Sequence, residues 1–164
     1  MEVLYITVPS FFDLEISLIR ELQKYCKVKI LIFVTPVSMH SSAFDIDNLG
    51  EKVCIYKASK MEQMEKYDNL IDRKSWYIAI NPSGKLYDSF RLDQLVKQFI
   101  KENNFKFIHL TTFGNKSTLF LYHTLKKWKN KLLTIHDVIP HSKKSFLRNK
   151  ISSLYINSFE NILT

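Results

Sequence analysis

The residues best suited to chemistry lie in the segment Leu132–His141, which reads LLTIHDVIPH. The apolar run Leu132–Ile135 predicts a short buried strand that delivers His136 and Asp137 to its carboxyl end. A histidine and an aspartate at that place can transfer a proton, orient a hydroxyl group or stabilise developing charge. Together with His141 they can also hold zinc or manganese. The alternative is structural, with a histidine bonded to backbone and an aspartate that caps the next helix.

Two other predicted strands end in polar or aromatic residues. His109 and Thr111 stand at the end of the apolar run 105–110, and Ser10, Phe11 and Phe12 follow the run 3–8. Ligands of a parallel α/β sheet bind outside the carboxyl ends of its strands, so all five residues are candidates for contact with a substrate. His109 can equally be a packed, hydrogen-bonded strand residue.

Several common site motifs are absent from the sequence. The loop Pro9–Phe12 has no glycine, which argues against a dinucleotide-binding dehydrogenase, and no P-loop or G-x-S-x-G motif occurs. Cys26 and Cys54 are isolated, so neither a disulfide framework nor a zinc site is indicated. These absences leave the three strand ends as the places where chemistry is expected.

Alternating strands and helices must position those strand ends. The run 3–8 predicts a strand, and an S-x-x-D signal at Ser10 predicts a helix to about Cys26, with Leu14, Leu18, Ile19, Leu22 and Tyr25 as its apolar residues. A second strand is predicted at 28–34. This first part therefore reads as a βαβ unit.

The second half of the chain is again periodic, whereas residues 35–84 are hard to interpret. Within that region the sequence gives only a strand at 53–56, a short helix at 61–67 and an apolar run at 76–80 without an assignment. Beyond it we expect helices at 86–103, 117–128 and 145–157, strands at 105–110 and 132–135, and the start of a strand at 161–164.

This alternation predicts an α/β protein with a Rossmann-like, doubly wound and mostly parallel sheet that carries helices on both faces. The length of 164 residues fits a single domain, residues 1–164. Because the sequence stops as another strand begins, we expect a domain that lacks its last elements, from a truncated or split gene product.

The net charge of +8 is unevenly distributed. Residues 1–82 hold 10 basic and 11 acidic side chains, whereas residues 116–150 hold nine basic side chains and one acid, Asp137. This basic stretch, residues 116–150, fits an anionic membrane surface or a phosphorylated ligand, or simply a solvated lysine-rich face. Nucleic acid is a poor candidate because few aromatic residues are interleaved with the basic ones. The apolar runs are too short to span a bilayer, which predicts a cytoplasmic protein, peripheral at most on the inner face of the plasma membrane.

Three segments together resemble glycosyltransferase family 4. They are VLYITVPSFFDLEISLIRELQK at the start, FKFIHLTT in the middle and the T-x-H-D-x-x-P-H pattern of 134–141. The resemblance implies the N-terminal, acceptor-side half of a GT-B enzyme that retains the configuration of the transferred sugar. It implies that His136 lies near the reacting sugar with Asp137 beside it, and that His109 matches a histidine at the end of the preceding strand. The family's Gly-Gly loop is replaced here by Pro9–Phe12.

The resemblance also implies partners and the lack of a bound cofactor. A nucleotide-sugar is the co-substrate, no metal is required, and the donor-binding C-terminal domain is missing or separately encoded. The acceptor is a saccharide or a lipid-linked saccharide, as in the synthesis of cell-surface polysaccharides, and we expect Ser10, Phe11, Phe12, His109, Thr111 and His141 to bind it. The transferase should be inactive as this chain alone, since one wall cannot form the cleft. The competing hypothesis is a non-catalytic Rossmann-like module that binds an anionic ligand or partner through a basic face.

Overall fold

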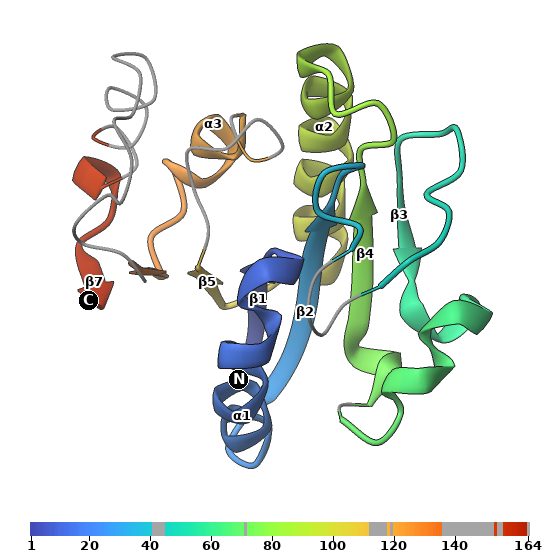
Figure 1. Ribbon diagram of the computed structural model, residues 1–164. Helices are drawn as coiled ribbons and strands as arrows, with labels where there is room; N and C mark the ends of the chain where they lie inside the picture. The colour runs from blue at the N-terminus through green and yellow to red at the C-terminus, as the bar shows by residue number, and fades with distance from the viewer. Residues whose placement is uncertain are drawn as a thin grey trace.

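The centre of the molecule is a seven-stranded sheet with strand order β3-β4-β2-β1-β5-β6-β7 (Figure 1). The computed structural model describes residues 1–40, 45–70, 72–111, 118, 120–135, 153 and 156–163. The strands are β1 (Glu2–Thr7), β2 (Lys27–Val34), β3 (Cys54–Lys57), β4 (Trp76–Ile80), β5 (Phe107–Leu110), β6 (Lys131–Thr134) and β7 (Asn161–Leu163).

Among the seven strands that the structure describes, six are parallel, and only β3, at one edge, runs antiparallel to its neighbour β4. Counted along the chain, the parallel strands lie in the spatial order 3-2-1-4-5-6, which is compatible with a Rossmann-like fold. The predicted α/β class and mostly parallel sheet are therefore confirmed. The order reverses between β1 and β5, the place where such sheets bind ligands.

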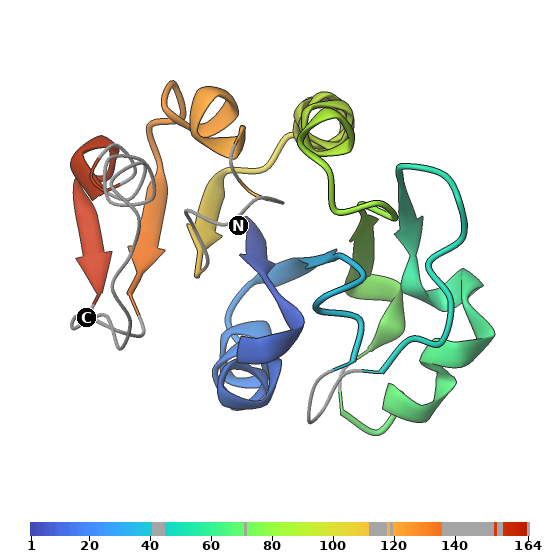
Figure 2. The ribbon, with the colours of Figure 1, turned by 45° about the horizontal axis from the view of Figure 1, so that its top comes forward.

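Helices lie on both faces of the sheet (Figure 2). Helix α1 (Phe12–Gln23) packs on one face, and α2 (Leu86–Asn103) and α3 (Leu121–Leu125) lie on the other. Strand β2 contributes to both cores, because Ile30 and Ile32 face the α1 side while Leu31 and Phe33 face the α2 side. A strand buried on both faces explains why 28–34 is apolar without alternation.

Helix α1 buries only part of the apolar set that the sequence predicts: Ile19 is buried and Leu22 packs against the core, whereas the other predicted residues are exposed. Phe12 and Ile19 are completely buried, whereas Leu14 and Leu18 are 70% and 45% exposed and Tyr25 lies in solvent. The helix carries apolar residues on two of its sides, so periodicity alone did not distinguish them. The side that begins with Phe12 is the buried one because Phe12 packs against the rings of Trp76 in β4 and of Tyr67.

The predicted cap of this helix is also wrong. Ser10 lies inside a 3₁₀ turn, Pro9–Phe11, and α1 begins after it with Phe11 as its N-cap and no side-chain cap. Proline at the first position of the 3₁₀ turn starts the turn earlier than the S-x-x-D signal implies, since its fixed φ suits a helical start.

The region that the sequence left unassigned contains one of the inner strands. The run Trp76–Ile80 is β4, which pairs with β2 on one side and β3 on the other. Three 3₁₀ helices, Ala58–Lys60, Glu62–Tyr67 and Arg73–Ser75, connect β3 to β4, so the short helix predicted at 61–67 is present in 3₁₀ form.

In the second half the elements agree with the predicted ones in kind, but among the described residues of the helix predicted at 117–128 only Leu121–Leu125, which form α3, are helical. Helix α2 has the predicted bounds and is capped by Asn104, which adopts the left-handed conformation with φ 48°. The start of a strand predicted at 161–164 is confirmed as β7, which pairs in parallel with β6. Of the helix predicted at 145–157, Ser153 and 156–157 are helical, and its other residues lie outside the described part. Within the described ranges no helix is both long and apolar enough to cross a bilayer.

Candidate functional site

The reversal in strand order places β1 directly beside β5. The two strands run in parallel with Tyr5 opposite His109, so both carboxyl ends open on the same edge of the sheet. Thr111, the residue after β5, fastens that edge: its backbone N–H and its hydroxyl both donate to the carbonyl of Ile6, at 3.0 and 3.1 Å. Its hydroxyl is therefore committed to the scaffold in this structure.

His109 is the one predicted site histidine whose surroundings the structure describes. It is only 4% exposed, and its ring stacks edge-on against Tyr5 at 4.5 Å between ring centroids. Its Nε2 is hydrogen-bonded to the Thr134 hydroxyl at 2.7 Å. A buried imidazole joined to the half-buried hydroxyl at the end of β6 can hold a proton or pass one toward the edge of the sheet.

Glu15 brings a carboxylate to the same side of the sheet. Its side chain on α1 is 2% exposed. Two causes raise the pKa of the Tyr5 hydroxyl far above its ordinary value: burial, which has the larger effect, and the negative charge of Glu15. Tyr5 therefore stays a neutral phenol. Glu15, Tyr5, His109 and Thr134 thus form what we call the polar row, which extends from α1 over β1 and β5 to β6.

The loop after β1 contributes less surface than the sequence predicts. Ser10 is exposed and Phe11 is half-buried against the α2-side core. Phe12 is fully buried, with its ring edge-on to Trp76 at 4.9 Å and to Tyr67 at 6.4 Å. We therefore assign Phe12 to the core and keep Ser10 and Phe11 as the residues of this loop that can meet a ligand.

The residues with the strongest motif cannot be placed. His136, Asp137 and His141 lie outside the described residues. The structure does describe the strand that precedes them, β6, which ends at Thr134 within hydrogen-bond distance of His109. Among the described residues no group of three or more His, Cys, Asp or Glu side chains could hold a metal ion.

The basic stretch is only partly described, and its described residues are not all alike. Lys126, Lys127 and Lys129 are exposed between α3 and β6, at the amino end of that strand. Lys131 is buried instead, and its ammonium group donates to the carbonyls of Leu125 and Lys126 at 3.2 and 3.0 Å. It closes the end of α3 and is not part of a solvated face.

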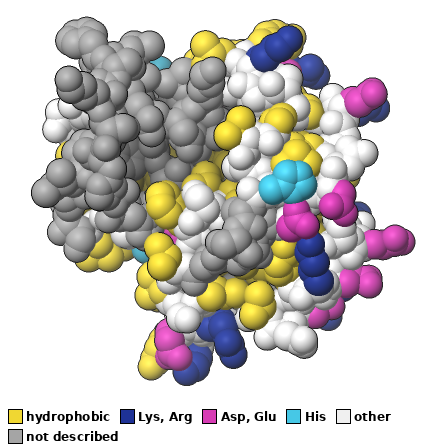
Figure 3. All heavy atoms as spheres, in the orientation of Figure 1, with side chains coloured by type: hydrophobic (Ala, Val, Ile, Leu, Met, Phe, Trp, Pro, Cys, Tyr) yellow, Lys and Arg dark blue, Asp and Glu magenta, His cyan; other side chains and the backbone are white. Residues whose placement is uncertain are grey.

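Elsewhere the surface charges are mixed. Figure 3 views the molecule in the orientation of Figure 1, and on the described part of that face basic and acidic side chains are interspersed. Ion pairs such as Arg73 with Asp68, and Lys66 with Asp45 at 3.6 Å, agree with the near-neutral balance of residues 1–82. This side of the molecule carries no described block of a single sign.

Three members of the polar row were not among the predicted site residues. Tyr5 is an ordinary strand residue in the sequence, and Thr134, although it opens the T-x-H-D-x-x-P-H pattern, was not singled out as a site residue. Glu15 had a usable signal, because it lies three residues after Phe12 and four before Ile19, on the buried side of α1. A carboxylate at a helical position shared with core residues is a candidate for a buried, functional acid.

No family model matches this chain, and no curated protein or solved structure is significantly similar to it, so the family assignment stays a prediction from the sequence.

Proposed function

We propose that this chain is the acceptor-side domain of a retaining glycosyltransferase, with a doubly wound fold that forms the N-terminal half of a GT-B enzyme. The observation that carries the proposal is the polar row, which lies beside the reversal in strand order. A buried histidine bonded to a hydroxyl, with a buried carboxylate on the same side, is suited to hydrogen-bonding and proton chemistry at a sugar hydroxyl. The T-x-H-D-x-x-P-H pattern begins at Thr134, which is the last residue of β6 and a member of the polar row.

The proposed reaction assigns each group a task. An acceptor hydroxyl forms a bond to the anomeric carbon of the nucleotide-sugar, the bond from that carbon to the nucleoside diphosphate breaks, and the acceptor proton passes to the leaving diphosphate. His136 and Asp137 act next to the reacting sugar, and His109 with Thr134 supports the strand end that precedes them in the chain. Ser10 and Phe11 contact a saccharide or lipid-linked acceptor. A donor-binding domain holds the nucleotide-sugar and supplies the second wall of the cleft.

An amide-resonance titration of the ¹⁵N-labelled chain with short oligosaccharides tests the acceptor site. We expect the largest shifts at Ser10, Thr111 and Thr134, at the carboxyl edge of the sheet. Ser10→Trp should abolish binding because the indole fills the approach to that edge. Ser59→Trp is the matched control, since Ser59 is also exposed but lies in the 3₁₀ helix after β3. Equal binding by wild type and Ser10→Trp contradicts the proposed acceptor site.

The second candidate is a non-catalytic module that binds an anionic ligand, and the exposed residues Lys126, Lys127 and Lys129 favour it. The same titration, repeated with inorganic polyphosphate, separates the two functions. A module of this kind predicts shifts at the three lysines that disappear at high salt, because exposed charges are screened. Oligosaccharide shifts near Ser10 with none at the lysines favour the transferase domain.

A direct assay addresses the need for a second wall. The purified chain, incubated with labelled nucleotide-sugars and a lipid extract, should transfer no sugar, because the donor and the reacting groups are not held together by one domain. Transfer by the chain alone would contradict the assignment of an acceptor-side half.

A further inference from the structure

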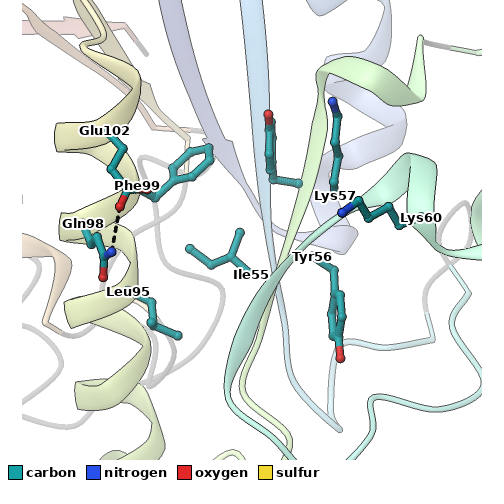
Figure 4. A pocket seen from close by; sticks show the side chains of 9 residues that line it. Ile55, Tyr56, Lys57, Lys60, Leu95, Gln98, Phe99 and Glu102 are labelled. Carbon is teal, nitrogen blue, oxygen red and sulfur yellow. Dashed lines mark hydrogen bonds between the residues drawn. The ribbon is translucent and has the colours of Figure 1, made fainter.

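A groove with a volume of about 480 Å³ lies between the edge strand β3 and helix α2 (Figure 4). Its floor comes from the strands, with Ile55 and Lys57 on β3 and Tyr77 on β4. Its wall is one side of α2, formed by Leu95, Gln98, Phe99 and Glu102, which follow each other at helical spacing.

The apolar part of the groove is incompletely covered. Phe99 is buried and its ring contacts Tyr77 at 4.7 Å between centroids, but Ile55, Tyr77 and Leu95 are only half-buried. The side chains of Ile55 and Leu95 point toward each other across the gap (Figure 4). Apolar surface is thus available to a ligand without any rearrangement of the core.

The polar part of the groove lies at the other end. Lys57 stands opposite Tyr77 in the strand register, and Lys60 follows from the next 3₁₀ helix. Neither lysine forms a salt bridge with any residue that the structure describes. Glu102, the one acid among the described residues of the lining, accepts a hydrogen bond from the Gln98 amide at 2.7 Å. Two positive charges therefore face one negative charge.

We propose that this groove binds an amphipathic anion, a small molecule with an apolar aliphatic or aromatic body and one carboxylate, sulfonate or phosphate group. The body lies between Ile55 and Leu95, and the acidic group meets Lys57 and Lys60. The volume falls in the range of small-molecule sites, about 300–1,000 Å³. The charged end lies at the start of β4, whereas the proposed acceptor site lies at the carboxyl ends of the parallel strands, so the two sites are separate.

Fluorescence titration with 1-anilinonaphthalene-8-sulfonate tests the groove, because this probe is an aromatic sulfonate. Leu95→Trp fills the apolar end and should weaken binding by on the order of tenfold. The double variant Lys57→Gln/Lys60→Gln should weaken it about fivefold, as expected for two exposed charge pairs. Lys74→Gln/Lys101→Gln removes the same charge from exposed positions that do not line the groove, and should leave the affinity unchanged.

A competition experiment identifies the chemical class. Octanoate should displace the probe from the folded chain, and octan-1-ol, which has a similar apolar body without the charge, should need a clearly higher concentration. Because the lysine variant changes only the groove's polar end, it remains informative even where Leu95→Trp destabilises the fold. Equal affinity of wild type and both lysine double variants, or equal displacement by octanoate and octan-1-ol, would overturn the proposal.

Discussion

Replacement of Phe12 tests whether this residue serves the core or the site. The side chain is completely buried and meets two aromatic rings edge-on, Trp76 at 4.9 Å and Tyr67 at 6.4 Å. Truncation of a buried phenylalanine to alanine costs about 3–5 kcal/mol, which includes the cavity left behind. Phe12→Leu keeps most of the volume and should cost about 1–1.5 kcal/mol, since the edge-on ring contacts are lost.

Urea unfolding, followed by tryptophan fluorescence or circular dichroism, measures these differences. With a slope of about 2 kcal/mol per molar urea for a chain of this size, Phe12→Ala should lower the midpoint by about 1.5–2.5 M. The matched control is Leu14→Ala on the same helix, where the side chain is 70% exposed and the change should stay within about 0.5 kcal/mol. A larger loss for Leu14→Ala than for Phe12→Ala would refute the observed orientation of α1.

Three further predictions concern single polar groups. Burial raises the pKa of the Asp93 carboxyl, which accepts a hydrogen bond from the Thr124 hydroxyl at 2.8 Å. The stability that this carboxyl contributes is therefore present at acid pH and is lost as the pH rises through the folded pKa. In pH-dependent urea unfolding, Asp93→Asn should gain stability relative to wild type from about pH 4 toward pH 7. Asn104→Ala should cost about 1 kcal/mol because φ is 48°, while Asn104→Gly should be close to neutral in the same assay. Thr134→Val should cost about 1–3 kcal/mol by removing the hydroxyl bonded to His109, and no loss would contradict that bond.

The sequence predicted best the elements whose apolar residues have only one arrangement. From Leu92 to Ile100 the apolar residues of helix α2 lie on one side, with Leu92, Val96 and Phe99 buried, and the bounds of the helix were predicted to the residue. Helix α1 has apolar residues on two sides, and only the packing against Trp76 and Tyr67 decides between Phe12 and Leu14. That contact joins parts of the chain far apart in sequence, so local periodicity could not reveal it.

The middle of the chain resisted prediction for a different reason. The 3₁₀ helices between β3 and β4 are three to six residues long, too short to show a repeat. Without them as landmarks, Trp76–Ile80 could not be assigned as an inner strand. At the site, the strand ends and His109 were predictable from strand order and residue type. The contacts of His109 with Thr134 and Tyr5 depend on register between strands, which the sequence does not encode locally.

The adjacency of β1 and β5 also bears on the order in which the molecule can assemble. Strand β1 lies between β2 and β5. Strand β2 follows β1 after one helix, whereas the hydrogen bond from Thr111, the residue after β5, to Ile6 joins residues 105 positions apart in the chain. At a synthesis rate of about 5–20 residues per second, β1 and β2 leave the ribosome roughly 4–15 seconds before Thr111. During that interval one side of β1 has unpaired backbone groups, a template for pairing with another chain. We therefore expect the nascent first βαβ unit to be the stage at which this protein most needs protection from aggregation.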